Sequence, residues 1–129
     1  MSINLIMAAD NEGGIGYKGK LPWQDPEDLK WFKRLTMDGI VVVGRNTFLE
    51  LPELKDREVR PVSKDEGYWN LHQALTVNPE NKEVWVAGGA MLYETAMPFI
   101  HRFYISRIPG IFDVDTHASF PLPWIPKST

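Results

Sequence analysis

The sequence predicts an α/β domain with a mainly parallel central sheet and helices on both faces. Uninterrupted apolar runs, which are typical of strands buried on both sides, alternate with segments of helical pattern. The apolar runs are residues 3–9 (INLIMAA), 40–44 (IVVVG), 84–87 (VWVA) and 103–108 (FYISRI). The helical segments are residues 25–37, 69–75 and 90–97. No repeat, low-complexity tract or interdomain linker interrupts the alternation, so we expect a single domain over residues 1–129.

Composition restricts the classes of function. The chain has 129 residues, 43% hydrophobic and 24% charged, as in ordinary globular domains. Its formal net charge of −3 gives no electrostatic reason to expect a nucleic-acid or anionic-membrane partner. The chain has no cysteine, which excludes disulfides and thiolate metal sites and fits a reducing compartment. The N-terminus lacks a basic flank and its apolar run is too short for a membrane span, so we expect a soluble, cytoplasmic protein.

Local signals support individual elements. The helix over residues 25–37 has Pro26 at its first position, where a missing backbone N–H costs nothing. Residues 40–44 are rich in β-branched side chains and form the clearest strand. Residues 59–62 also have strand character, but Pro61 limits such a strand to the edge of a sheet.

Ligands of parallel α/β sheets bind beyond the carboxyl ends of the strands, so the segments that follow strands form the candidate site. These segments are residues 10–19, which contain four glycines, 44–47 (GRNT) and 87–90 (AGGA). The pair Gly88–Gly89 would let backbone N–H groups approach a phosphate, although such a pair also makes a simple tight turn. Arg45 would bring a guanidinium to the same edge, but a solvated loop arginine explains it as well.

Several common site motifs are absent. The full GxGxxG fingerprint is missing, so a Rossmann dinucleotide fold is not supported. Neither HExxH nor a Walker A sequence occurs. The histidines lack the spacing of metal ligands, so no metal site is expected; they are His72, His101 and His117.

Asp28 is an acid on an apolar helix face. With Phe32 and Leu35 it follows the i, i+4, i+7 spacing of one helical stripe. One explanation is helix capping, because Asp25 and Asp28 resemble a capping box at the positive end of the helix dipole. The other is ligand binding: a partly desolvated carboxylate, with a raised pKa, suits a heterocycle that donates two hydrogen bonds. The helix alone leaves both explanations open.

Several separated segments together resemble the dihydrofolate reductase family. GYKGKLPW after the glycine loop resembles the family's active-site loop, and DPEDLKWFKR resembles its substrate helix. VVVGRNTF and VWVAGGAMLYE resemble its cofactor-binding turns, and FYISRI and DVDTHASFP its late strand and Asp-Thr-His segment. The matches occur in the family's order from about residue 1 to 121. The resemblance implies hydride transfer from NADPH to C6 of dihydrofolate, with protonation at N5.

The resemblance also implies substrate-side roles. Asp28 would hold the 2-amino group and N3 of the pterin, and Trp23 would position water near that site, beside Leu21 of the LPW signature. Arg57 matches the arginine that pairs with the glutamate tail, and Ser106 stands where the family usually has threonine. The implied substrate-binding residues are Ile6, Ala8, Leu29, Phe32, Leu51, Arg57 and Ser106.

On the cofactor side, the resemblance implies contacts with nicotinamide, with the phosphates and with the adenosine 2′-phosphate. The phosphate contacts fall to residues 45–47 and the 2′-phosphate contacts to Ser63 and Lys64. The full implied set is Ala9, Ile15, Gly16, Gly44, Arg45, Asn46, Thr47, Ser63, Lys64, Ala87, Gly88, Gly89, Ala90 and Tyr93.

The sequence departs from the family pattern in two ways. Ala90 and Met91 replace a glycine and a polar or basic residue, and Ala87 replaces a larger aliphatic residue. Family members continue into a C-terminal hairpin, whereas this sequence ends in FPLPWIPKST, whose prolines forbid a central strand. We therefore expect a fold without the hairpin and an uncovered strand over residues 103–108, which would form a homodimer or lie under the C-terminal tail.

Two alternatives to an active dihydrofolate reductase follow from these departures. The first is a reductase-like binding or structural module with weak or no turnover. The second is a reductase of another pterin or of a pyrimidine. Arg57, in the position of the tail-binding arginine, favours folate as the substrate.

Overall fold

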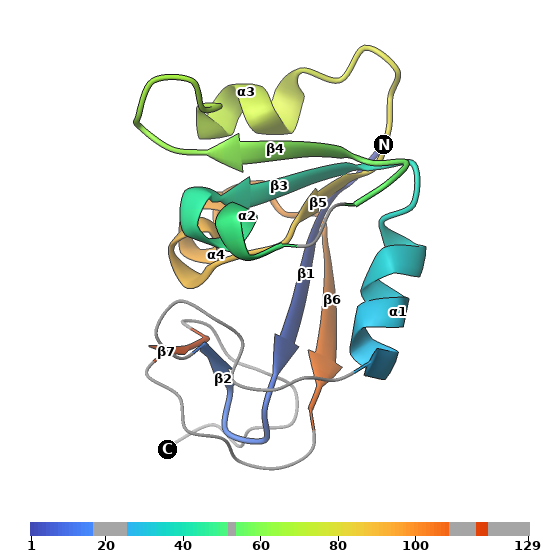
Figure 1. Cartoon of the computed structure of the whole chain (residues 1–129), viewed down its shortest axis with the longest axis vertical. Coiled ribbons are helices and arrows are strands. Elements are labelled where there is room, and N and C mark those ends of the chain that lie inside the picture. The colour runs from blue at the N-terminus through green and yellow to red at the C-terminus, as the bar shows by residue number, and fades with distance from the viewer. Residues whose placement is uncertain (17–25, 52–53, 109–115, 119–129) are drawn as a thin grey trace.

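The computed structural model describes residues 1–16, 26–51, 54–108 and 116–118. Its centre is a five-stranded sheet in the order β4-β3-β5-β1-β6 (Figure 1). Every strand pair in this sheet is parallel, which confirms the predicted mainly parallel α/β architecture. Its strands are β1 (Ile3–Ala9), β3 (Ile40–Gly44), β4 (Glu58–Val62), β5 (Val84–Val86) and β6 (Arg102–Arg107).

Strand positions follow from the side chains. The interior strand β3, between β4 and β5, has four fully or almost fully buried β-branched residues, Ile40 to Val43. The strand that contains Pro61 lies at an edge, as predicted, because proline has no backbone N–H to donate to a further strand. The Pro61 carbonyl accepts from the Trp69 N–H. The other edge is β6.

Within the described residues, five short helices connect the strands. They are α1 (Pro26–Leu35), α2 (Arg45–Glu50), α3 (Leu71–Thr76), α4 (Ala90–Ala96) and the 3-10 helix η1 (Met97–Phe99). The prediction for residues 69–75 is shifted: Asn70 caps the helix by accepting from the Gln73 N–H at 2.8 Å, and Trp69 instead bridges to Val62. The predicted helix over 25–37 ends at Leu35, followed by a turn in which Asp38 has a φ of 60°.

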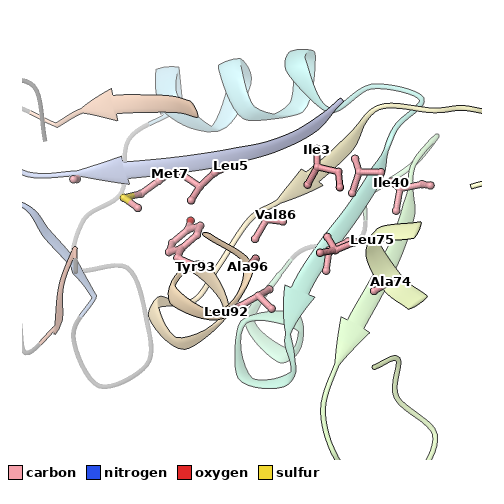
Figure 2. Close-up of a cluster of buried hydrophobic side chains, with 13 residues drawn as sticks. Ile3, Leu5, Met7, Ile40, Ala74, Leu75, Val86, Leu92, Tyr93 and Ala96 are labelled. Atoms are coloured by element: carbon pink, nitrogen blue, oxygen red, sulfur yellow. The ribbon is translucent and has the colours of Figure 1, made fainter. Parts of the chain in front are cut away.

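The hydrophobic core lies between the sheet and helices α3 and α4 (Figure 2). Its members are Ile3, Leu5, Met7, Ala9, Ile40, Val42, Ala74, Leu75, Val84, Val86, Leu92, Tyr93 and Ala96. The odd-numbered residues of β1 belong to this core, so the even-numbered residues face the opposite side of the sheet. Figures 1 and 2 both place α1 along β1 and β6 on that opposite side. Helices therefore cover both faces, as expected.

One charged residue is buried at the edge of the core. Arg60 on β4 is 3% exposed, and its guanidinium stacks 4.2 Å from the centre of the Trp69 ring. It also donates to the Ala74 carbonyl at 3.0 Å and pairs with Glu58. These contacts satisfy the buried charge and fasten α3 to the edge strand.

A second, two-stranded sheet lies near the carboxyl end of β1 (Figure 1). It pairs β2 (Gly14–Gly16) with β7 (Thr116–His117) in antiparallel orientation. Asp10, fully buried, fixes the turn from β1 into β2, because its Oδ1 accepts from the N–H groups of Glu12 at 2.9 Å and Gly14 at 2.8 Å. No sequence pattern predicted this role of Asp10.

Candidate functional site

The turns after β3 and β5 meet at the carboxyl edge of the sheet. The Gly44 N–H donates to the Gly88 carbonyl at 2.7 Å, and the Ala87 N–H donates to the Val42 carbonyl at 2.9 Å. A Cβ on Gly89 would lie 3.4 Å from Oγ1 of Thr47. The structure therefore brings together the segments 44–47 and 87–90, which the sequence had predicted to form one site.

The helices that begin at these turns lack the side-chain caps and the acids that would compete with a bound anion. The caps of α2 and α4 are Gly44 and Gly89, and neither makes a side-chain capping hydrogen bond. Neither helix has an acid in its first turn, and Arg45 adds a positive charge at the start of α2. The first N–H groups of a helix need partners, and here glycines keep bulky side chains away from them.

Gly88 also has a backbone reason to be glycine. Its φ is 119°, and a Cβ would lie 3.3 Å from the hydroxyl of Tyr93. That hydroxyl donates to the Ile6 carbonyl at 2.8 Å, and Tyr93 is 7% exposed. Tyr93 thus has a packing role: it fastens α4 to β1 beneath the glycine turn.

The predicted substrate-side residues of the sheet share one face. Ala8 on β1 is the register partner of Ser106 on β6, and Ile6 lies two residues before Ala8 on the same side. This is the face along which α1 lies. From α1, Phe32 is half-buried, whereas Leu29 is 44% exposed.

Several predicted site residues are buried or lie outside the described residues. Ala9 is fully buried in the core, and its carbonyl accepts from the Ile108 N–H at 2.8 Å. Leu21 and Trp23 lie outside the described residues. Asp28 lies in the first turn of α1, and its side chain is outside the described part of the structure. Its capping and ligand-binding explanations therefore both stay predictions.

Arg57 connects the start of β4 to the end of α1. Its Nε donates to Oγ1 of Thr36 at 2.9 Å, and its two terminal nitrogens donate to the carbonyls of Lys33 and Lys55. A guanidinium has five N–H donors, and these contacts use three of them. The half-buried side chain is therefore oriented with donors remaining for a carboxylate.

At the start of α2, Arg45 meets an acid that the sequence did not single out. Its Nη1 pairs with the Asp65 carboxylate, and its guanidinium lies 5.9 Å from the centre of the Tyr68 ring. Ser63 accepts from the Asp65 N–H at 3.1 Å, and Lys64 is exposed. The sequence signal that could have indicated this pair is an acid directly after Ser63 and Lys64. Its partner, Arg45, is twenty residues away in the chain.

Within the described ranges, no group of three His, Asp or Glu side chains could hold a metal ion. The helices in those ranges are all too short or too polar to cross a membrane.

Paired glycine turns at the edge of a parallel sheet place the chain in the class of α/β domains that bind ligands beyond their strand ends. A family model described as dihydrofolate reductase matches residues 2–124, and the chain belongs to that family. The family and fold predicted from the sequence are therefore confirmed.

Known relatives agree with this membership. Dihydrofolate reductase type 9 of Escherichia coli is 30% identical over 94% of this chain and 78% of its own length. The Drosophila melanogaster enzyme is 35% identical over 99% of this chain and 82% of its own. A solved dihydrofolate reductase from Enterococcus faecalis, in complex with NADP(H) and RAB-propyl, superposes with a TM-score of 0.82 at 27% identity. That match covers 95% of this chain and 79% of the solved chain.

Proposed function

We propose that the chain reduces 7,8-dihydrofolate to tetrahydrofolate, with hydride transfer from NADPH to C6 and protonation at N5. The observation that carries this proposal is the match of the dihydrofolate reductase family over residues 2–124. The relatives do not favour the alternatives, an inactive module or a reductase of another pterin or pyrimidine.

The substrate side of the proposal rests on α1 and the facing strands. Asp28, in the first turn of α1, pairs with the 2-amino group and N3 of the pterin, since a carboxylate accepts two parallel hydrogen bonds. Ile6 and Ala8 present apolar surface from β1, and Phe32 does so from α1. The exposed Leu29 and the half-buried Leu51 are further apolar members of the proposed substrate site, and Trp23 and Leu21 precede the helix in the sequence.

The cofactor side rests on the glycine turns. A Cβ on Gly89 would fill the space beside Oγ1 of Thr47. Gly44 likewise has no side chain to obstruct the neighbouring backbone N–H groups. These groups, with Asn46 and Ala90, fit the phosphates of a dinucleotide. When bound, NADPH supplies the hydride; the chain orients the two rings and excludes water. Ile15 and Gly16 close the nicotinamide end of the site.

Arg57 provides a test of the substrate. The helix rises about 7.5 Å from Asp28 to Lys33. The Lys33 carbonyl, which orients Arg57, is therefore more than one helical turn from Asp28, the proposed pterin anchor. Arg57→Lys keeps the charge but loses the planar fork, so KM for dihydrofolate should rise about tenfold. KM for a dihydropterin without a glutamate tail, measured on the same variant, should stay unchanged. Equal changes for the two substrates would contradict a folate-specific role.

We also propose that two copies of the chain pair through the β6 edge. The support is that β6 is an edge strand among the described residues and that two aromatic side chains are exposed there, Phe103 on β6 by 48% and Phe99 in η1 by 50%. An antiparallel pairing centred on Phe103 would set these apolar side chains together and complete the backbone hydrogen bonds of the edge. Sedimentation at micromolar concentration should show a dimer. A strict monomer would contradict the pairing.

We place the enzyme in the cytoplasm, because a chain without cysteine suits a reducing compartment. Its expected partners are the small-molecule substrate and NADPH, with no nucleic acid or membrane partner.

A further inference from the structure

The turn after β4 carries an acid beside the arginine of the proposed phosphate site. Gly44 and Val62 are register partners at the ends of β3 and β4, so the segments that follow the two strands leave the sheet side by side. Arg45 comes directly after β3, and Asp65 comes shortly after β4. This topology explains why the Asp65 carboxylate pairs with Nη1 of Arg45.

The pair is held in place but remains accessible. Oγ of Ser63 accepts from the Asp65 backbone N–H at 3.1 Å and so fixes the turn. The side chains of Arg45 and Asp65 are 49% and 57% exposed, so a ligand can reach both. Ser63 is one of the residues proposed to lie near the adenosine 2′-phosphate, and the acid is therefore within that same subsite.

The charges of this subsite cancel. Arg45 and Lys64 are cations, and Asp65 and Glu66 are anions on the same exposed turn. A 2′-phosphate carries nearly two negative charges, so it must compete with Asp65 for the guanidinium. The 2′-hydroxyl of NADH, in contrast, can donate to a carboxylate, and an acid at such a position generally favours the cofactor without the phosphate.

We propose that Asp65 is a specificity-determining residue that weakens the preference for NADPH over NADH. Its carboxylate occupies the Arg45 guanidinium that would otherwise be available to the 2′-phosphate, and it accepts a hydrogen bond from the 2′-hydroxyl of NADH. The enzyme therefore uses both cofactors, with NADPH favoured less than in a subsite without the acid. This inference rests on the proposed function, because it takes Ser63 and Lys64 as the residues around the 2′ position; it adds Arg45 to them, since Arg45 pairs with Asp65 of the same turn.

The test compares Asp65→Asn with Glu66→Gln in the full chain. Both variants remove one negative charge from the same turn, but Asp65 is the acid paired with Arg45. Calorimetric titration should show that Asp65→Asn binds NADPH about tenfold tighter and NADH no tighter than the unaltered chain. Glu66→Gln should change NADPH binding by about twofold at most, since an exposed charge without direct contact is screened. Equal effects of the two variants, or equal tightening of NADPH and NADH by Asp65→Asn, would overturn the proposal.

A second titration separates this inference from the catalytic assignment. Adenosine 2′,5′-bisphosphate and adenosine 5′-monophosphate differ in the 2′-phosphate and require no turnover. Asp65→Asn should tighten the bisphosphate selectively, whether or not the chain reduces dihydrofolate. Absence of any gain for the bisphosphate would overturn the role of Asp65, even if dihydrofolate is reduced normally. Turnover of dihydrofolate, measured separately, decides the proposed function.

Discussion

Asp28→Asn should lower kcat/KM for dihydrofolate at least about a hundredfold at neutral pH. The amide keeps the size of the carboxylate but cannot accept hydrogen bonds from both the 2-amino group and N3, and it has no negative charge to favour a protonated pterin. The loss should be smaller at low pH, where the substrate arrives already protonated. Steady-state rates of NADPH oxidation across a pH series measure both effects.

The matched control is Glu27→Gln on the same helix. Glu27 is an exposed neighbour that pairs with Lys30 at 3.7 Å, so its charge should not affect the rate measurably. Thermal unfolding of both variants separates the two explanations of Asp28. If Asp28 only caps α1, Asp28→Asn should lower the melting temperature and leave the rate unchanged. That result would remove Asp28 from the mechanism.

Gly88→Ala should impair both folding and cofactor binding. The φ of 119° is unfavourable for alanine, and the new Cβ would meet the Tyr93 hydroxyl at 3.3 Å. We expect the free energy of unfolding to fall by about 1–3 kcal/mol. NADPH affinity should fall as well, because the Gly88 carbonyl, which accepts from the Gly44 N–H, would shift with the turn.

Gly67→Ala is the corresponding control. Gly67 also has a positive φ, 89°, but a Cβ there would have no atom within 4 Å. It should cost about 1 kcal/mol of stability through the backbone alone and lower NADPH affinity less than Gly88→Ala does. Chemical denaturation and NADPH titration of the two variants make the comparison. Wild-type NADPH affinity in a folded Gly88→Ala chain would contradict the assignment of the glycine turn.

Patterns within single segments predicted much of the fold. The β-branched run at residues 40–44 forms the buried interior strand β3, and Pro61 correctly placed its strand at an edge. In contrast, α2 was not predicted, because Phe48 and Leu49 are exposed on it and its sequence has no apolar stripe. Its helical form depends on the turn after β3 rather than on its own periodicity.

The site was predictable only where its residues are contiguous. The glycine turns follow strands in the sequence, so their meeting at one edge could be expected from the parallel sheet. The pairing of Arg45 with Asp65 depends instead on β3 lying beside β4, which no local pattern reveals. Likewise, no local pattern reveals that the Tyr93 hydroxyl donates to the Ile6 carbonyl across the core, and the cofactor contact of Tyr93 stays a prediction.

The most direct test mixes the purified chain with NADPH and dihydrofolate and follows both the loss of NADPH and the formation of tetrahydrofolate. We expect one tetrahydrofolate for each NADPH consumed, and no consumption when dihydrofolate is left out. A folded chain that binds both molecules but forms no tetrahydrofolate would contradict the proposed reaction.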